Sequence, residues 1–132
     1  MIKLKDLPED VRRRINIVAT PSERTPKERQ PNKTERAHMK KLEVWRLQKI
    51  VVWYAYEPMK IKCAPSMYYI PDFAVLYPDN KLYFHEVKGP FIRDRALHKV
   101  YLAAKVYEHF NFWVFQYDDK YALTKYYKVA HV

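Results

Sequence analysis

The stretch LYFHEVKGPF, residues 82–91, places two opposite charges, Glu86 and Lys88, inside a run of largely apolar residues. Side chains alternate between the two faces of a strand, so Glu86 and Lys88 share one face, opposite to His85. Burying an unpaired charge is costly. The two side chains therefore need partners, which are either each other or groups from outside the chain, such as a metal ion and a phosphate.

Asp72 adds a second carboxylate to the same place. The runs SMYYIPDFAVLY and KLYFHEVK flank the turn signal Pro78-Asp79-Asn80, which predicts a hairpin. In one register of this hairpin, Asp72 lies opposite Glu86 on the neighbouring strand, or within about one residue of that position. Carboxylates that close repel each other, and a Mg²⁺ ion with oxygen ligands relieves the repulsion. Lys88 could then orient or deprotonate a water molecule at the metal, or neutralise charge on a phosphate.

Glu35 is a further acidic candidate with two readings. It lies in the first turn of a predicted helix, on the same stripe as Met39 and Leu42, and this stripe should face the sheet. The spacing Asn32-x-x-Glu35 is also that of a capping box, in which the Glu side chain binds the backbone N–H of the cap residue. Both readings, metal ligand and helix cap, stay open on the sequence.

Composition limits the class of protein. The chain has 132 residues, of which 48% are hydrophobic, so it can bury one core as a small globular domain. Its net charge of +10 favours a polyanionic partner, with nucleic acid first. The alternatives are a charge that serves solubility or adsorption to acidic membranes. A single glycine, Gly89, excludes a glycine-rich phosphate loop.

Cysteine usage and hydropathy indicate the compartment. Cys63 is the only cysteine, which excludes an internal disulfide and a cysteine-rich zinc site and fits a reducing cytosol. The sequence has no apolar run of transmembrane length and no signal-peptide core at its start. We therefore expect a cytoplasmic protein with no membrane partner, and Cys63 as a packing residue.

The elements that must position these residues follow from the pattern of the chain. A short helix, with Asp6 as a possible cap, precedes a proline-containing linker over 20–34, and a second helix follows from Asn32. Three strands, a helix within 93–110 and the strand NFWVFQY come next. The tail YALTKYYKVAHV fits either an edge strand or a short helix. This order predicts an α/β fold with a mixed sheet flanked by helices, and divides the chain into 1–31 and 32–132.

Pro71-Asp72, followed after thirteen residues by Glu86-Val87-Lys88, resembles the signature of the PD-(D/E)XK nuclease superfamily. With Gly89 and a basic helix directly after, the context is most similar to phage endonuclease I-type Holliday-junction resolvases and related small phage nucleases. The resemblance covers roughly residues 32 to 117. It implies a restriction-endonuclease-like mixed sheet and Mg²⁺-dependent hydrolysis of phosphodiester bonds, with Mn²⁺ able to substitute.

The resemblance also implies roles for particular residues. Asp72, Glu86 and Lys88 are the matched catalytic positions, and Glu35 is placed where junction-resolving members often carry another acidic ligand. The implied metal site consists of Asp72, Glu86, Val87 and Glu35. Contacts with DNA are expected from the following basic residues near the motif: Arg93, Arg95, His98, Lys99, Lys33 and Arg36.

The expected substrate is branched or distorted DNA, and the expected assembly is a homodimer, because resolving a junction needs two symmetric incisions. Exposed aromatics near Trp53 or Trp113 could supply the dimer interface. A phage-encoded chain of this kind would act in the host cytoplasm. Three other readings remain: a catalytically idle DNA-binding module, a general phage nuclease that cuts ordinary duplex, and a basic protein that binds a protein partner through its N-terminal helix.

Overall fold

The structure is a computed structural model of the chain, and it describes residues 6–16, 19–21 and 30–129. The elements in chain order are α1 (Glu9–Asn16), β1 (Ala19–Pro21), α2 (Lys33–Leu47), β2 (Trp53–Tyr56), β3 (Met59–Ala64), β4 (Met67–Tyr69), β5 (Phe73–Leu76), β6 (Leu82–Lys88), α3 (His98–Val106), β7 (Asn111–Tyr117) and β8 (Leu123–Lys128).

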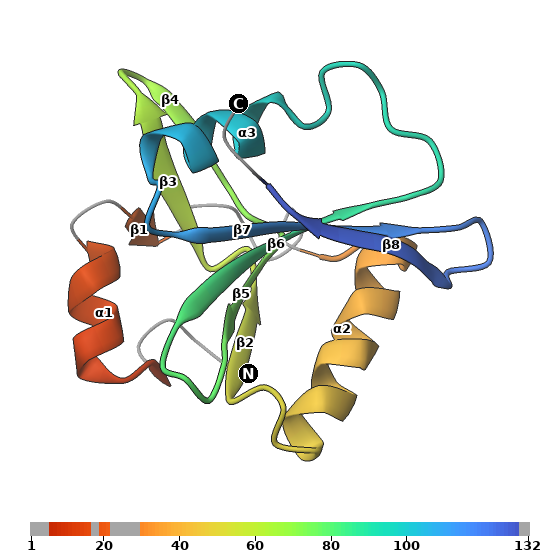
Figure 1. Cartoon of the computed structure of the whole chain (residues 1–132), viewed down its shortest axis with the longest axis horizontal. Coiled ribbons are helices and arrows are strands. Elements are labelled where there is room, and N and C mark those ends of the chain that lie inside the picture. Colours follow the sequence, from red (N-terminus) through yellow and green to blue (C-terminus); the bar gives the residue numbers. More distant parts are fainter. Residues whose placement is uncertain (1–5, 17–18, 22–29, 130–132) are drawn as a thin grey trace.

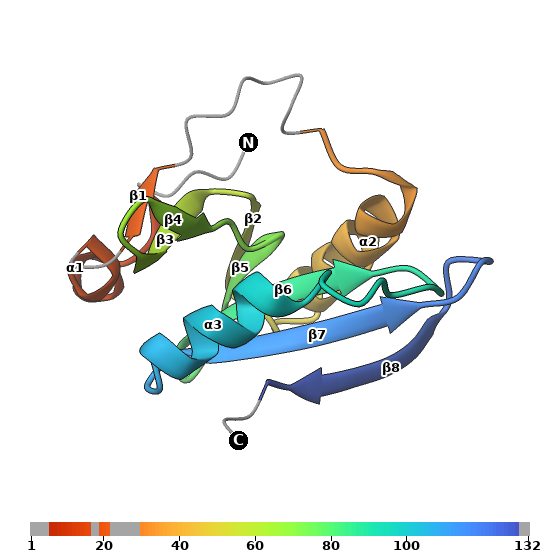
Figure 2. The same cartoon turned by 90° about the horizontal axis from the view of Figure 1, so that it is seen from above.

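A five-stranded mixed sheet in the order β2-β5-β6-β7-β8 forms the centre of the molecule. Strands β1, β3 and β4 form a separate three-stranded sheet. Helix α3 and the small sheet cover one face of the central sheet, and α2 packs on the other (Figures 1 and 2). The predicted α/β class with a mixed sheet flanked by helices is confirmed.

The register of the central strands places the candidate residues. Strands β5 and β6 form the predicted antiparallel hairpin, in which Phe73 pairs with His85. Strand β7 runs parallel to β6, with Glu86 beside Val114. A parallel neighbour needs a crossover connection, and α3 supplies it. Asp72 directly precedes Phe73, so its backbone is level with Glu86, as the sequence predicted.

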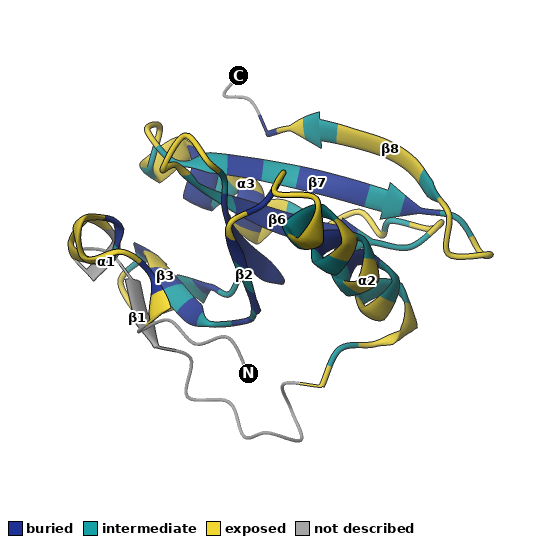
Figure 3. Ribbon diagram, turned by 90° about the horizontal axis from the view of Figure 1, so that it is seen from below, coloured by how far each residue is buried: buried dark blue, intermediate teal, exposed yellow. Residues whose placement is uncertain are grey.

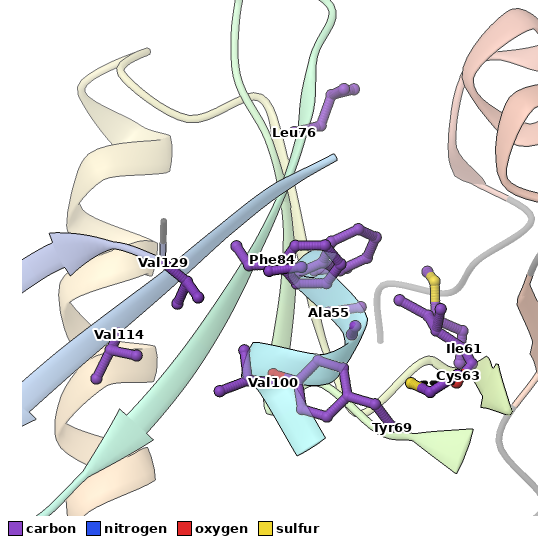
Figure 4. Close-up of a cluster of buried hydrophobic side chains, with 14 of the residues drawn as sticks. Ala55, Ile61, Cys63, Tyr69, Leu76, Phe84, Val100, Val114 and Val129 are labelled. Atoms are coloured by element: carbon purple, nitrogen blue, oxygen red, sulfur yellow. Dashed lines mark hydrogen bonds between the residues drawn. The ribbon is translucent and has the colours of Figure 1, made fainter. Parts of the chain in front are cut away.

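Two apolar clusters hold the layers together. The larger lies under α3 and the small sheet and includes Phe84, Val100 and Val114 (Figure 4). The smaller lies under α2 and includes Leu42, Val75 and Phe115. Because β6 is covered on both faces of the sheet, side chains on both of its faces are buried near its carboxyl end. This explains its nearly continuous apolar sequence.

Several predicted boundaries differ from the structure. The run SMYYIPDFAVLY was expected as one strand, and it breaks at Ile70-Pro71 into β4 and β5, which belong to different sheets. Proline lacks the N–H that a continuing ladder would need, which accounts for the break. Strand β3 was not predicted, although its buried and more exposed residues alternate. The ambiguous tail forms the edge strand β8, whose residues are mostly exposed (Figure 3).

The N-terminal helix packs on the domain. Leu7 and Val11 are buried and join the larger apolar cluster. Helix α1 begins at Glu9, three residues after the predicted cap Asp6. The linker predicted over 20–34 falls mostly on residues 22–29, which lie outside the described residues. The division of the chain between 31 and 32 stays a prediction.

One surface expectation was wrong. Exposed aromatics were expected near Trp53 or Trp113, but Trp53 is only 6% exposed, because it is buried in the larger cluster together with Leu7, Val11 and residues of the small sheet. Trp113 is half-buried. No helix within the described ranges is long and apolar enough to cross a membrane.

Candidate active site

Asp72 and Glu86 meet where β5 and β6 separate. The Asp72 side chain is buried at 9% exposure, and its Oδ2 accepts a hydrogen bond of 2.7 Å from the backbone N–H of Val87. Glu86 is 8% exposed. The register of the hairpin and this hydrogen bond hold the Asp72 carboxyl against the carboxyl end of β6.

Glu86 has two partners on its face of the sheet. Its Oε1 accepts a 2.7 Å hydrogen bond from the Tyr69 hydroxyl of β4. Its Oε2 lies 2.9 Å from Nζ of Lys88 in an ion pair. The two charges that stand out in the sequence are therefore partners of each other, and the carboxylate is oriented from both sides.

Glu35 forms the predicted capping box. Its backbone N–H donates to Oδ1 of Asn32 at 2.8 Å, and its Oε1 accepts from the Asn32 backbone N–H at 2.9 Å. The same Oε1 accepts a 3.0 Å hydrogen bond from the Tyr56 hydroxyl. The Glu35 and Asp72 carboxyls are also close enough for a side-chain hydrogen bond. The capping role is thus present, and the metal-ligand role stays a prediction.

Burial and neighbouring carboxylates perturb this site strongly. Burial raises the pKa of Asp72 well above its ordinary value, and the charges of Glu86 and Glu35 raise it further. Burial also raises the pKa of the Tyr56 phenol, with additional contributions from Glu35, Glu57 and Asp72. The site is thus a patch rich in carboxyl groups within a basic protein, and Asp72 favours its protonated form there.

Lys88 is the cation of this patch. Burial acts to lower the pKa of its ammonium, but the carboxylates of Glu86, Asp72 and Glu35 outweigh burial, so that its pKa is raised above the ordinary value. Lys88 is therefore protonated at neutral pH in this arrangement. That state suits neutralisation of phosphate charge better than removal of a proton from water.

The arrangement fits a hard cation with few protein ligands. In the part of the chain that the structure describes, no group of three or more His, Cys, Asp or Glu side chains is placed to hold a metal ion. Mg²⁺ is usually bound through one or two carboxylates, with water and substrate phosphate as its other ligands. Asp72 and Glu86 provide such a pair: both side chains are buried, Lys88 is ion-paired with Glu86, and the raised pKa of Asp72 reflects the cost of a second carboxylate charge at this place.

The predicted DNA-binding residues are exposed and fall into two groups. Lys33 and Arg36 lie in the first turn of α2. This turn is close to the end of β6: a Cβ atom built onto Gly89 would lie 4.0 Å from Oγ1 of Thr34. The others are Arg93, Arg95, His98 and Lys99. The segment joining β6 to α3 and the N-terminal end of α2 lie at the same end of the molecule (Figure 2).

The second group is only partly helical. Arg93 and Arg95 precede α3, which begins at His98 and is shorter than predicted. Lys99 lies in the first turn of α3 and is exposed, and its charge acts to lower the pKa of the Cys63 thiol. Cys63 is buried as expected, and burial raises the pKa of its thiol.

Sequence reasoning missed three side chains of the site: Tyr56, Glu57 and Tyr69. Glu57 is 4% exposed, and its backbone N–H donates to the Asp72 carbonyl at 2.8 Å. The signals available in the sequence were Glu57, a charge at the end of an apolar run next to Pro58, and Tyr69, three residues before Asp72. Their place in the site depends on the pairing of β2 with β5 and of β4 with β3, which the sequence did not reveal.

The opposite face of β6 carries a buried histidine pair. His85 was expected to be a packed or supporting imidazole, and its Nδ1 lies 2.9 Å from Nε2 of His38. Nδ1 of His38 lies 2.6 Å from the Tyr117 hydroxyl, and Nε2 of His85 lies 3.2 Å from that of Tyr77. This chain of hydrogen bonds ties α2 to the sheet behind the candidate site.

Comparisons of the chain with protein-family models, with curated proteins and with solved structures found no match.

Proposed function

We propose that this protein is a metal-dependent endonuclease that hydrolyses DNA phosphodiester bonds at Asp72, Glu86 and Lys88. The observation that carries the proposal is the juxtaposition of two buried carboxylates on paired strands with a protonated lysine ion-paired to one of them. Structural ion pairs seldom bury a second carboxylate beside the first, because its charge is left uncompensated. A cation at this place would allow both groups to ionise.

The cation would be Mg²⁺, held by Asp72 and Glu86 with the main-chain carbonyl of Val87 and, as a further ligand, Glu35. When bound, it stabilises charge that develops on the phosphate under attack. The Val87 N–H holds the Asp72 carboxyl, and the Tyr69 hydroxyl holds that of Glu86. Lys88 places its ammonium beside them and adds positive charge toward the phosphate.

Branched or distorted DNA is the substrate that we propose. Phe91 follows the motif on the exposed segment before α3 and is 91% exposed. An apolar ring in such a position is of the kind that inserts between unstacked base steps. Arg93 and Arg95 on the same segment are exposed and can contact the phosphate backbone. The fold that we propose is restriction-endonuclease-like, with the β5–β6 hairpin as its catalytic element.

The experiment compares cleavage of a labelled four-way junction and a linear duplex with Mg²⁺. We expect Asp72→Asn and Glu86→Gln to abolish cleavage while DNA binding stays intact or tightens, because a charge that repels phosphate is removed. Lys88→Ala should also abolish cleavage with little loss of affinity. Glu108→Gln is the control, since Glu108 is an exposed carboxylate between α3 and β7 that belongs to neither the candidate site nor its supporting contacts, and it should cleave normally.

Two results would contradict the proposal. Full cleavage by Asp72→Asn, after contaminating nucleases are excluded, would remove the assignment of the site. DNA binding by the wild type without cleavage in Mg²⁺ or Mn²⁺ would instead support an idle DNA-binding module. Ca²⁺ should support binding but not cleavage, because its looser coordination positions the reacting groups poorly.

A further inference from the structure

The face of the central sheet opposite to Glu86 carries an aromatic groove beside α2. It has a volume of about 450 Å³, within the range of roughly 300 to 1,000 Å³ that small-ligand sites have. Its rings come from the β5–β6 turn and from β6, β7 and β8, and they belong to Tyr77, Tyr83, His85, Trp113, Phe115 and Tyr126. We call this surface the aromatic groove.

The rings form two sides and a floor. Tyr77 and Tyr83 are one side, with ring centroids 4.5 Å apart. Trp113 and Tyr126 are the other, with centroids 6.3 Å apart. His85 and Phe115 lie between them, 4.3 Å apart and tilted by 34°. The groove thus presents flat apolar surfaces from two directions.

Exposure distinguishes this groove from ordinary packing. Tyr126 is 62% exposed although its ring stacks on that of Phe115 at 5.8 Å and 15°. Trp113, Tyr77 and Tyr83 are half-buried. Helix α2 packs on the same face, but it covers the part of the sheet nearer Phe73 and Tyr117 and leaves Tyr126 uncovered.

The charges around the groove favour an anionic occupant. Lys128 is exposed and pairs with Trp113 across β7 and β8. Asp79 is the carboxylate that lines the groove, at its turn end. Lys128 thus lies beside the groove on β8, within a chain of net charge +10.

We propose that the aromatic groove binds unpaired nucleobases of single-stranded DNA. Base stacking on aromatic side chains needs flat rings and tolerates any sequence, and Lys128 together with the net positive charge of the chain would attract the backbone that connects the bases. The inference rests on the proposed function for its partner class and extends it. Because the groove lies on the opposite face from Glu86, it would hold a strand segment away from the bond that is cut.

The test measures binding without cleavage. A fluorescent oligothymidylate of about eight nucleotides, within the range that single-strand sites span, is titrated with the full chain in EDTA. We expect Tyr126→Ala to weaken binding about tenfold, which corresponds to the loss of one stacked base. Tyr126→Phe should bind like the wild type, since it keeps the ring. Tyr121→Ala is the control, because Tyr121 is an exposed tyrosine of the β7–β8 turn outside the groove.

The outcomes separate the two proposals. Equal binding by Tyr126→Ala and the wild type overturns the groove assignment, whatever the cleavage assay shows, and so does an equal loss in Tyr121→Ala. A Tyr126-dependent loss in a protein that does not cleave DNA supports the groove and contradicts the nuclease. Dissociation of a dimer by Tyr126→Ala, with unchanged oligonucleotide affinity, would assign the groove to a second copy of the chain and overturn the proposal.

Discussion

The carboxyl group of Glu35 belongs both to the N-terminal cap of α2 and to the candidate site around Asp72. It closes the capping box of α2 with Asn32, and it lies beside the Asp72 carboxyl, whose pKa it helps to raise after burial and Glu86. A residue that only capped the helix would have no need to approach Asp72. This proximity is the structural support for a role of Glu35 in the candidate site.

Glu35→Gln should separate the two roles. The Gln side chain can still accept the Asn32 and Tyr56 hydrogen bonds, so we expect an unchanged melting temperature. The charge beside Asp72 is lost, and we expect the cleavage rate to fall by about 10- to 100-fold, as for residues that support metal ligands. Glu43→Gln on the same helix, where Glu43 pairs with Arg46, should cleave normally. Unchanged cleavage by Glu35→Gln would leave only the capping role.

The buried histidines should make the protein sensitive to acid. Burial holds the pKa of His38 at about 3, against an ordinary 6.5, and burial also holds the pKa of His85 well below its ordinary value. Below about pH 6.5 the unfolded chain takes up protons that the folded protein does not. The histidines should therefore lower the free energy of unfolding as pH decreases below 6.5, with His38 contributing about 1.4 kcal/mol per pH unit down to its pKa of about 3. Asp72, whose pKa is raised in the folded protein, acts in the opposite direction.

Urea unfolding across this pH range measures the effect. His38→Gln should be less stable at neutral pH, because it disturbs the hydrogen bonds to Tyr117 and His85, yet its stability should depend less on pH. His109→Gln, a change at an exposed histidine, should follow the wild-type curve. An unaltered pH slope in His38→Gln would show that folding does not lower the pKa of His38.

At the scale of elements, the end of β6 does not depend on glycine for its conformation. Gly89 does not have a positive φ, and an added Cβ would meet nothing closer than Oγ1 of Thr34 at 4.0 Å. The carbonyls of Gly89 and Pro90 accept hydrogen bonds from the Gln116 amide, each at 3.3 Å. These hydrogen bonds use only backbone carbonyls at positions 89 and 90, so a methyl side chain at position 89 should not remove them.

We expect Gly89→Ala to keep the stability of the protein or to raise it by about 0.4 to 1 kcal/mol, because alanine reduces the conformational freedom of the unfolded chain. Thermal unfolding of the two proteins side by side measures this change. Ala103→Gly, at a fully buried position of α3, should lower stability and calibrates the assay. A marked loss of stability in Gly89→Ala would mean that the segment after β6 requires glycine.

At the scale of the whole molecule, one chain carries one candidate site, while resolving a junction requires two incisions. A two-fold dimer is the simplest assembly that supplies both. Trp53 is buried and cannot contribute to such an interface. The exposed edge strand β8 and the segment around Phe91 are two surfaces that could contact a second subunit or DNA.

We predict a dimer by light scattering at micromolar concentration and paired nicks across a four-way junction. The net charge of +10 should make the affinity for DNA fall steeply as salt is raised, because phosphate contacts release counterions. A monomer that cuts junction and linear duplex equally well would change the interpretation to a general nuclease. Affinity that is independent of salt would contradict DNA binding through the basic surface.

The sequence determined what depends on local spacing. The capping box of Asn32 and Glu35, the β5–β6 hairpin and the strand Asn111–Tyr117 were all readable, because turn signals and side-chain alternation act within a few residues. The proximity of Asp72 and Glu86 followed from the same hairpin. These features specify the α/β class and most of the candidate site.

Only the tertiary structure decided the contacts between distant segments. Tyr69 meets Glu86 because the chain breaks at Pro71 and sends β4 into a second sheet. His38 meets His85 because α2 packs on the face of β6 opposite to Glu86. Such contacts, like the burial of Trp53, arise from the packing of whole layers, for which no local spacing in the chain carries a signal.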